Sequence, residues 1–545
     1  MTTPPAAPAP RARRHGAHCL FAVAAAVIAL AAYHAAFFED FQSSDGANYA
    51  TVARNLLEGR GLTSSVIQPG LMKLVRTDRR GQAYVTQMPL WPVLLAAWFH
   101  VFGATPTAAV TLSYLCCLAA TAACWWMGSW LSGRMLGGYL AVALLLTNPH
   151  YVSNVIAVYN VALHSALIAG VFVFLWLPPT FGRAILVGVL VGLAVVTREP
   201  SIFVLAGIGY CWWDVSKERD PRRLEAMSTA TRHLLVVIAI VAVALMLEKE
   251  FVARAAGTRA TPTLRATFFY YTPVLDANWY FIYDDPALGL SPLSYFSHHP
   301  LTLAKKVGYQ LWVCLLQQTL PVMQSTTTWF LPVMAPWLLV DRRARRFSYA
   351  LLLVLGVLVV VGTVTTLHLQ YFLAYFPEIN AVVAATVLAL MGRLREGSLV
   401  RPRDRWLARV AITYALVPVL FNLAPYLAGR RMATGEYGLT PRQVATLTQF
   451  IEKNTPLDAV VVSSHSPLLA WHTRRTIVQY SGSPAYRISN SAMWHRIDAQ
   501  VPIDFILLNS WAAERPEMAV LDGFSMVKAI KTPEVKAWLF RRRER

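Results

Sequence analysis

Asp45 is the residue whose type and position are best suited to chemistry. It lies in the stretch SSDGANYATVARNLLEGRGL (43–62), directly after an apolar run, Cys19–Phe38, that is long enough to cross a bilayer. A carboxylate held against an apolar bundle beside a water-accessible cleft can act as a general base on a hydroxyl or an amine. An aspartate can equally cap a helix, because its oxygens accept bonds from the first free N–H groups. Both roles are compatible with this position.

The residues after Asp45 predict the helix that positions it. Apolar side chains fall on one helical face and polar ones on the other, and Gly59 and Gly61 end the pattern. The apolar face comprises Tyr49, Val52, Ala53, Leu56 and Leu57, and the polar face comprises Asn48, Thr51, Arg54, Asn55 and Glu58. We therefore expect an amphipathic helix that lies on the outer membrane surface and begins at Asp45.

The composition indicates a polytopic membrane protein. The chain is 56% hydrophobic with a mean hydropathy of +0.44, and its apolar runs alternate with short polar stretches. The net charge of +20 would suggest a nucleic-acid partner in a soluble protein, but here the basic residues cluster in short loops, where membrane topology explains them. We expect no nucleic-acid partner, and a preference for membrane lipids and other anionic phosphates.

About eleven transmembrane helices are predicted from these runs. They cover about 18–38, 106–131, 135–148, 160–177, 184–197, 201–213, 232–249, 327–340, 347–367, 371–391 and 407–428. This count places every basic cluster in the cytoplasm, with the N-terminus inside and the C-terminus outside, provided that the helix 301–324 lies at the outer interface without crossing.

The predicted organisation has three parts. Residues 1–17 form a cytoplasmic segment, and 18–428 form a transmembrane domain with large outer loops at 39–105 and 250–326. Within the first loop, 88–103 is expected to form a helix packed on the bundle. The last part, 429–545 (the tail), is predicted to be a small extracytoplasmic α/β domain, because a capped helix after Thr440 is followed by strand-like runs. These runs are 459–464, 477–480, 504–510 and 524–530, with a short helix opening at Ser466.

An ordered set of motifs resembles the GT-C glycosyltransferases, polytopic enzymes that use polyprenyl-phosphate sugars and include the protein mannosyltransferases and aminoarabinose transferases. The matching residues in the first outer loop are Asp45, Tyr49, Ala53, Arg54, Gly59, Pro89, Leu90, Trp91, Pro92, Phe102 and Gly103. The stretches 188–203, 368–385 and 458–480 resemble later parts of the same family. The resemblance runs over most of the chain.

The resemblance implies a GT-C-like fold in the bacterial inner membrane, with the active site on the extracytoplasmic face. It implies transfer of a sugar from a polyprenyl-phosphate donor to a glycan, lipid or protein acceptor, with inversion at the anomeric carbon. Asp45 carries over as the catalytic base, and Tyr49 and Arg54 as substrate-binding residues. The leaving phosphate gains charge in the transition state, so cations must face it.

The chain departs from the family pattern where phosphate would be held. Gln87 and Met88 stand where relatives often have a lysine, and Gln370 replaces an arginine. The loop 148–160 also lacks the second acidic residue that many members carry. Other outward-facing cations must therefore hold the phosphate. The candidates are Arg198, Arg265, Lys305, Lys306 and His368.

Alternative roles compete with this interpretation. Glu39 and Asp40 form a rival carboxylate pair, although a solvated interface is expected where the first span ends. The sequence supports no cofactor or metal, because His298 and His299 are adjacent and have neither an HxxxH pattern nor cysteine partners. A transporter or flippase of an anionic amphiphilic lipid is the second functional class, and an envelope scaffold is the third. Internal repeats and charges within spans, which typify transporters, are not evident.

Overall fold

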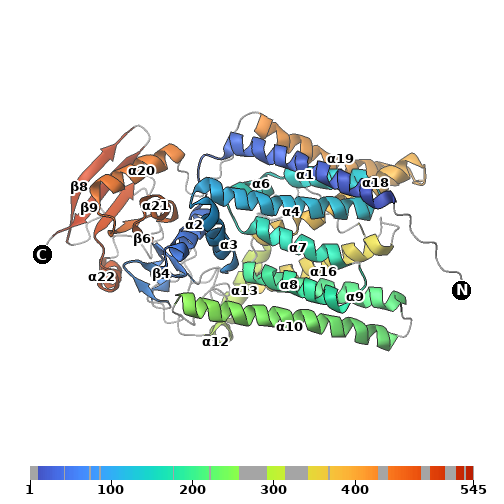
Figure 1. The fold of residues 1–545 in the computed structure, drawn as a ribbon, viewed down its shortest axis with the longest axis horizontal. Helices are drawn as coiled ribbons and strands as arrows, with labels where there is room; N and C mark the ends of the chain where they lie inside the picture. Colours follow the sequence, from blue (N-terminus) through green and yellow to red (C-terminus); the bar gives the residue numbers. More distant parts are fainter. Residues whose placement is uncertain are drawn as a thin grey trace.

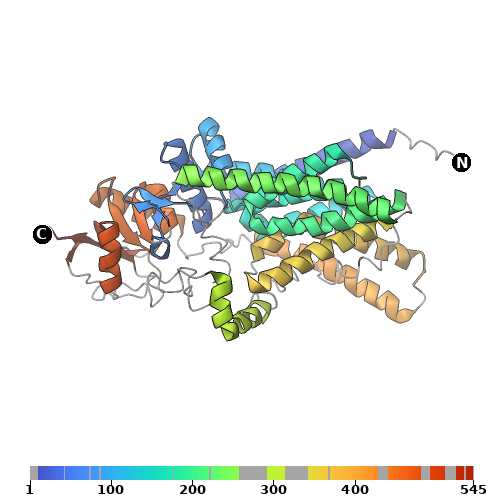
Figure 2. The same cartoon turned by 90° about the horizontal axis from the view of Figure 1, so that it is seen from below.

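The computed structural model is an elongated molecule with a helical bundle at one end and the tail at the other (Figures 1 and 2). It describes residues 10–41, 43–72, 75–84, 88–175, 177–219, 223–256, 291–312, 335, 342–365, 369–399, 401–427, 440–464, 466–479, 491–509, 523–532 and 535–543. Two short helices of the first outer loop lie between the bundle and the tail (Figure 1).

Helices occupy every predicted span except 327–340, of which Ala335 alone is described. They are α1 (Pro10–Phe37), α4 (Pro106–Ser132), α5 (Met135–Leu146), α7 (Val161–Leu175), α8 (Phe181–Thr197), α9 (Val204–Arg219), α10 (Arg223–Ala256), α16 (Arg342–Val364), α18 (Phe376–Arg395) and α19 (Pro402–Leu427). A further helix, α6 (Pro149–Ile156), lies between two predicted spans. Five helices in the described ranges, namely α1, α4, α10, α16 and α18, are long and apolar enough to cross a membrane. The pair α6 and α7, bent by 117°, brings the number to six at most. The chain is thus a helical membrane protein, and the count of eleven spans stays a prediction.

Ion pairs join two segments that the sequence places in the cytoplasm. Arg346, at the start of α16, is buried and lies 2.6 Å from Asp214 and 2.7 Å from Glu218 of α9. Arg342 lies 3.0 Å from Glu218. The start of α16 and the end of α9 therefore meet at one end of the bundle. The predicted topology places both segments on the same side of the membrane, which is compatible with this contact.

The first outer loop supplies the helices α2 (Ser44–Leu57) and α3 (Leu90–Phe102). The α3 helix confirms the prediction for 88–103 and packs on α2. Its Trp91 is fully buried and donates from Nε1 to the carbonyl of Val158, 3.0 Å away, in the turn between α6 and α7. This loop is therefore a packed part of the molecule that rests on one end of the bundle.

The polar face of α2 is covered by other parts of the chain, and Thr51, Arg54 and Asn55 are all buried. The expected position of α2 on the outer membrane surface stays a prediction. Asn55 donates from Nδ2 to the carbonyl of Thr63 (2.9 Å) and to Ser65 Oγ (3.1 Å). Polar side chains on a helix face can hydrogen-bond buried backbone as well as water, and here the rest of the loop and the tail supply those partners.

The tail confirms most of its predicted elements. Helix α20 (Pro441–Asn454) has the expected capping box between Thr440 and Gln443, and α21 (Ser466–Thr473) opens at Ser466. The predicted strands are β5 (Val460–Ser463), β6 (Thr476–Gln479), β7 (Phe505–Asn509) and β8 (Phe524–Lys531), while α22 (Ser491–Gln500) and β9 (Lys536–Arg542) complete the described elements. The sheet order is β2-β6-β5-β7-β9-β8, in which β2, β6, β5 and β7 are parallel and β9 is antiparallel to both neighbours.

The edge strand β2 (Val66–Ile67) comes from the first outer loop and pairs in parallel with β6, Val66 opposite Ile477. Ile67 is fully buried in the core of the tail. Arg79, near the small antiparallel sheet formed by β1 (Thr63–Ser64), β4 (Gly81–Ala83) and β3 (Thr77–Asp78), lies 2.7 Å from Asp504 of the tail. The predicted boundary at 429 thus omits a strand that belongs to the sheet.

Candidate functional site

Ser43, and not Asp45, caps helix α2. The Ser43 hydroxyl oxygen accepts a hydrogen bond from the Gly46 N–H (2.9 Å) and donates to the carbonyl of Ala157 (3.0 Å). A Cβ at Gly46 would lie 2.2 Å from the same carbonyl, so glycine alone allows this close approach. The first turn of α2 is therefore pressed onto the turn after α6. Asp45 is half-buried in that first turn, where the helix dipole favours a negative charge without assigning it the cap.

Arg198 follows the last residue of α8 and is buried, with 9% of its surface exposed. Its Nε donates to Asn160 Oδ1 at 2.8 Å, and Asn160 in turn donates from Nδ2 to the carbonyl of Thr197 at 3.2 Å. The guanidinium carbon lies 5.3 Å from the ring centroid of Tyr371, in the short helix α17 (Leu369–Leu373). Three elements of the bundle therefore hold this cation in place.

Tyr49 connects Asp45 to Arg198. It lies one turn after Asp45 on α2, is almost fully buried, and forms a side-chain hydrogen bond with Arg198. Burial raises the pKa of Tyr49, and the nearby carboxylates of Asp45 and Glu199 raise it further while Arg198 opposes them. Burial likewise raises the pKa of Tyr84, with smaller contributions from Tyr49 and Asp45. Both phenols thus stay protonated at neutral pH and are able to donate hydrogen bonds.

This arrangement supplies the two groups that acid–base transfer chemistry on a phosphate ester requires. A half-buried carboxylate, Asp45, is accessible to a reacting hydroxyl, and a buried cation, Arg198, lies across Tyr49 from it. A buried cation stabilises negative charge that develops on a leaving group more strongly than an exposed cation does in water.

The other predicted residues lie elsewhere or beyond the described residues. Arg54 contacts α21 of the tail, and Lys305 and Lys306 lie on α13 (Pro300–Tyr309). Arg265 and His368 fall outside the residues that the structure describes. A substrate contact by any of these five stays a prediction.

The rival carboxylate Asp40 binds the tail. Its Oδ2 lies 3.0 Å from His472 Nε2, and its Oδ1 accepts from the N–H of Phe41 at 2.7 Å. These contacts fix the end of the first span to α21. They give Asp40 a structural role at the exit of α1, which agrees with the choice of Asp45 as the reactive carboxylate.

Lys306 is buried on α13, which packs against α16, and its burial lowers the pKa of its ammonium to about 7. The unfolded chain therefore binds more protons than the folded one between about pH 7 and the ordinary value of 10.5, so stability must rise with pH in this window.

We expect Lys306→Met to reduce the rise in thermal stability between pH 7 and pH 9, measured by the melting temperature in detergent. The limiting slope that one such group adds is about 1.4 kcal/mol per pH unit. Lys305→Met is the matched control, because Lys305 is exposed on the same helix and should leave the slope unchanged. Identical slopes for wild type and both variants would contradict the buried, low-pKa lysine.

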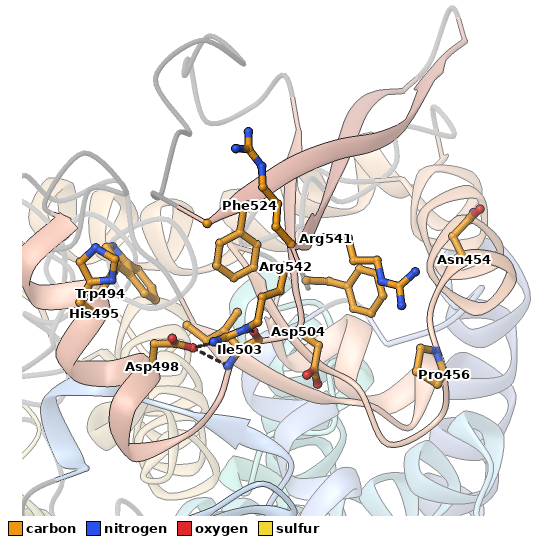
Figure 3. Close-up of a pocket in the computed structure, with 13 residues that line it drawn as sticks. Asn454, Pro456, Trp494, His495, Asp498, Ile503, Asp504, Phe524, Arg541 and Arg542 are labelled. Carbon is orange, nitrogen blue, oxygen red and sulfur yellow. Dashed lines mark hydrogen bonds and ion pairs between the residues drawn. The ribbon is translucent and has the colours of Figure 1, made fainter. Parts of the chain in front are cut away.

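A cavity of about 620 Å³ opens in the tail, at the edge where β5 and β7 begin (Figure 3). Three of the ionisable groups that line it already have charged partners. Arg542 pairs with Asp498 and donates from Nε to the carbonyl of Ile503 (2.8 Å), while Asp504 pairs with Arg79. None of the predicted site residues lines it, so the candidate site remains the cluster around Asp45.

No family model and no curated protein matches the chain. Among solved structures, ArnT from Cupriavidus metallidurans bound to undecaprenyl phosphate is similar, with a TM-score of 0.54 and 10% identity over 95% of this chain and 97% of that one. Its apo state gives 0.53 and 11% over the same shares. The Archaeoglobus fulgidus oligosaccharyltransferase, in complex with Zn and sulfate, gives 0.50 and 12% over 89% of this chain and 67% of that one. This chain has the GT-C fold.

Within the GT-C fold, the sequence found the carboxylate, the tyrosine and the arginine of the cluster but missed four neighbours. Tyr84, Asn160, Glu199 and Tyr371 all lie close to Tyr49 or Arg198. For Asn160 and Glu199 the available signal is position, because Asn160 directly precedes the apolar helix α7 and Glu199 follows the apolar helix α8 by two residues.

The described residues hold no group of three or more His, Cys, Asp or Glu side chains placed to hold a metal ion. His298 and His299 end α12 (Pro292–His298) and begin α13, where His299 packs its ring against Tyr295 at 4.7 Å.

Proposed function

We propose that this protein is an integral-membrane glycosyltransferase that moves a sugar from a polyprenyl-phosphate donor to an acceptor on the extracytoplasmic side. The observation that carries the proposal is the convergence of Asp45 and Arg198 on Tyr49, at the outer end of a bundle with the GT-C fold. The similar ArnT structure contains undecaprenyl phosphate, which supports a polyprenyl-phosphate donor. The proposed location is the bacterial inner membrane.

In the proposed reaction, an acceptor hydroxyl or amine attacks the anomeric carbon of the donor sugar. The Asp45 carboxylate takes the acceptor proton as the new bond to that carbon forms. The bond between the anomeric carbon and the phosphate oxygen breaks, and its electron pair leaves with the polyprenyl phosphate. The buried Arg198 faces the negative charge that grows on this phosphate. Direct attack opposite the leaving group inverts the anomeric configuration.

The two remaining phenols complete the proposed site. Tyr49 is held by Arg198 and stays protonated, so it orients the guanidinium and keeps it beside Asp45. Tyr84 lies near the same carboxylate and is also protonated. Neither serves as the base, because the pKa of each phenol is raised by burial, whereas the half-buried Asp45 remains open to a reacting group. The acceptor is a glycan, a lipid or a protein.

The proposal is tested by a transfer assay on the protein purified in detergent. We expect it to release polyprenyl phosphate from at least one member of a panel of polyprenyl-phosphate sugars, with the anomeric configuration of the product inverted. The panel should include hexosyl and pentosyl donors, with envelope lipids and glycans as acceptors. Failure to consume any donor, or a product of retained configuration, would contradict the proposed reaction.

A further inference from the structure

The tail helix α21 packs against α2, and its Trp471 also contacts α3. Trp471 is buried there, with its ring edge-on to Phe41 at 5.1 Å and tilted against Phe99 of α3 at 6.1 Å. Figure 1 shows α21 beside α2, at the junction of the tail and the bundle. Because Trp471 and Tyr49 belong to one hydrophobic cluster, the tail shares its packing with the helix that carries Asp45.

The guanidinium group of Arg54, on α2, packs against the ring of Trp471. Its guanidinium carbon lies 4.6 Å from the indole centroid, and it donates from one terminal nitrogen to the carbonyl of Trp471 (2.7 Å) and from the other to that of Ala470 (3.1 Å). These carbonyls lie in the last turn of α21, where a cation is favoured by the helix dipole. Burial lowers the pKa of Arg54 to about 10, so it remains charged at neutral pH.

Helix α2 is thus fixed at both ends. Ser43 and Gly46 press its first turn onto the turn after α6 in the bundle, and Arg54 attaches its last turns to the tail. Asp45 and Arg54 are nine positions apart on α2, which corresponds to roughly 13 Å along the helix. If the end of α2 near Arg54 rotates, Asp45 therefore moves relative to Arg198. Arg198 is held separately in the bundle through Asn160.

We infer that Arg54 and Trp471 are positioning residues, through which the tail sets the placement of Asp45 against Arg198. This inference rests on the proposed function. The tail has further attachments, namely the pairing of β2 with β6 and the pair between Arg79 and Asp504. Loss of Arg54 therefore leaves the tail in place and releases one end of α2. Arg54 acts through Asp45 and not as a ligand of substrate.

The test compares Arg54→Met with Arg442→Gln, a matched control because Arg442 is exposed on the tail helix α20. For Arg54→Met, kcat should fall by about 10- to 100-fold while the donor KM changes little. The reason is that a displacement of a catalytic group such as Asp45 by about 1 Å lowers the reaction rate by a factor of this size. Hydrogen exchange of residues 44–57 should accelerate, with the bundle helices unchanged. Trp471→Phe should retain more activity than Trp471→Ala, because it keeps an aromatic face beneath the guanidinium.

Three outcomes would overturn the inference. An unchanged kcat together with unchanged hydrogen exchange in Arg54→Met would show that the contact between Arg54 and Trp471 does not position Asp45. A raised donor or acceptor KM at constant kcat would instead make Arg54 a substrate ligand. Accelerated exchange without loss of transfer would show that α2 loosens with no effect on Asp45. If the wild-type protein consumes no donor, both the proposed function and the positioning role that rests on it are wrong. The hydrogen-exchange measurement still shows, in that case, whether the contact between Arg54 and Trp471 holds α2 in place.

Discussion

Asp45→Asn lowers sugar transfer by roughly two to four orders of magnitude, the usual contribution of a general base, and leaves the melting temperature nearly unchanged. Asparagine has almost the same shape but accepts no proton at neutral pH. The cap of α2 is provided by Ser43, so the substitution removes no capping bond. The measurement is kcat for release of polyprenyl phosphate, together with a thermal melt of the same preparation.

Two sets of variants separate the base from its surroundings. Ser43→Ala should cost about 1 kcal/mol of stability through loss of the cap. Glu39→Gln and Asp40→Asn should be milder than Asp45→Asn in transfer, and Asp40→Asn should mainly weaken the contact with His472. Full activity of Asp45→Asn with loss of activity in Asp40→Asn would identify the other carboxylate as the base. If all three carboxylate variants remain active, the transporter hypothesis takes precedence.

Arg198→Gln is expected to lower kcat by roughly two to three orders of magnitude, because one fixed donor to a developing anion contributes on this scale. Arg198→Lys should recover part of the loss. It keeps the positive charge but not the planar group that simultaneously bonds Asn160 and stacks over Tyr371. The assay measures kcat with saturating donor, so that weakened binding is not mistaken for weakened transfer.

The control for Arg198 is Tyr371→Phe, which preserves the aromatic ring beneath the guanidinium and should retain most of the activity. A melting temperature measured for each variant distinguishes loss of chemistry from loss of fold. Near-wild-type kcat in a folded Arg198→Gln protein would exclude this residue as the cation facing the phosphate and return attention to Lys305 and Lys306.

The sequence predicts the helices and strands of this protein better than it predicts which other parts of the chain pack over them. The helical period of 44–57 predicts the helix, but it does not show which groups contact its polar face. Arg54 finds its acceptors 416 and 417 residues further along the chain. No local pattern distinguishes a polar side chain that faces water from one that faces a carbonyl brought in from so far away. The cap was misassigned for a related reason, since Ser43, Ser44 and Asp45 are all good capping residues and differ by one position.

The candidate site was predicted in composition but not in geometry. Motif order selected Asp45 and Tyr49, and Arg198 was one of five candidate cations. That these residues lie together depends on how the end of α8 packs against the start of α2. In the tail, the strand-like apolar runs in 459–464 and 504–510 indicated strands. The strand β9 was not predicted because it ends in a basic run, and β2 was not predicted because it is only two residues long.

The edge strand donated by the first outer loop imposes an order on biogenesis. Val66 and Ile67 leave the ribosome roughly 400 residues before their partners Ile477 and Val478, so the sheet closes only after nearly the whole chain has been made. Such non-local pairing is slow to form. Until β6 has been made, the loop carries an unpaired strand that is open to pairing with other chains. A chain that terminates before β6 keeps this unpaired edge permanently and stays prone to such pairing.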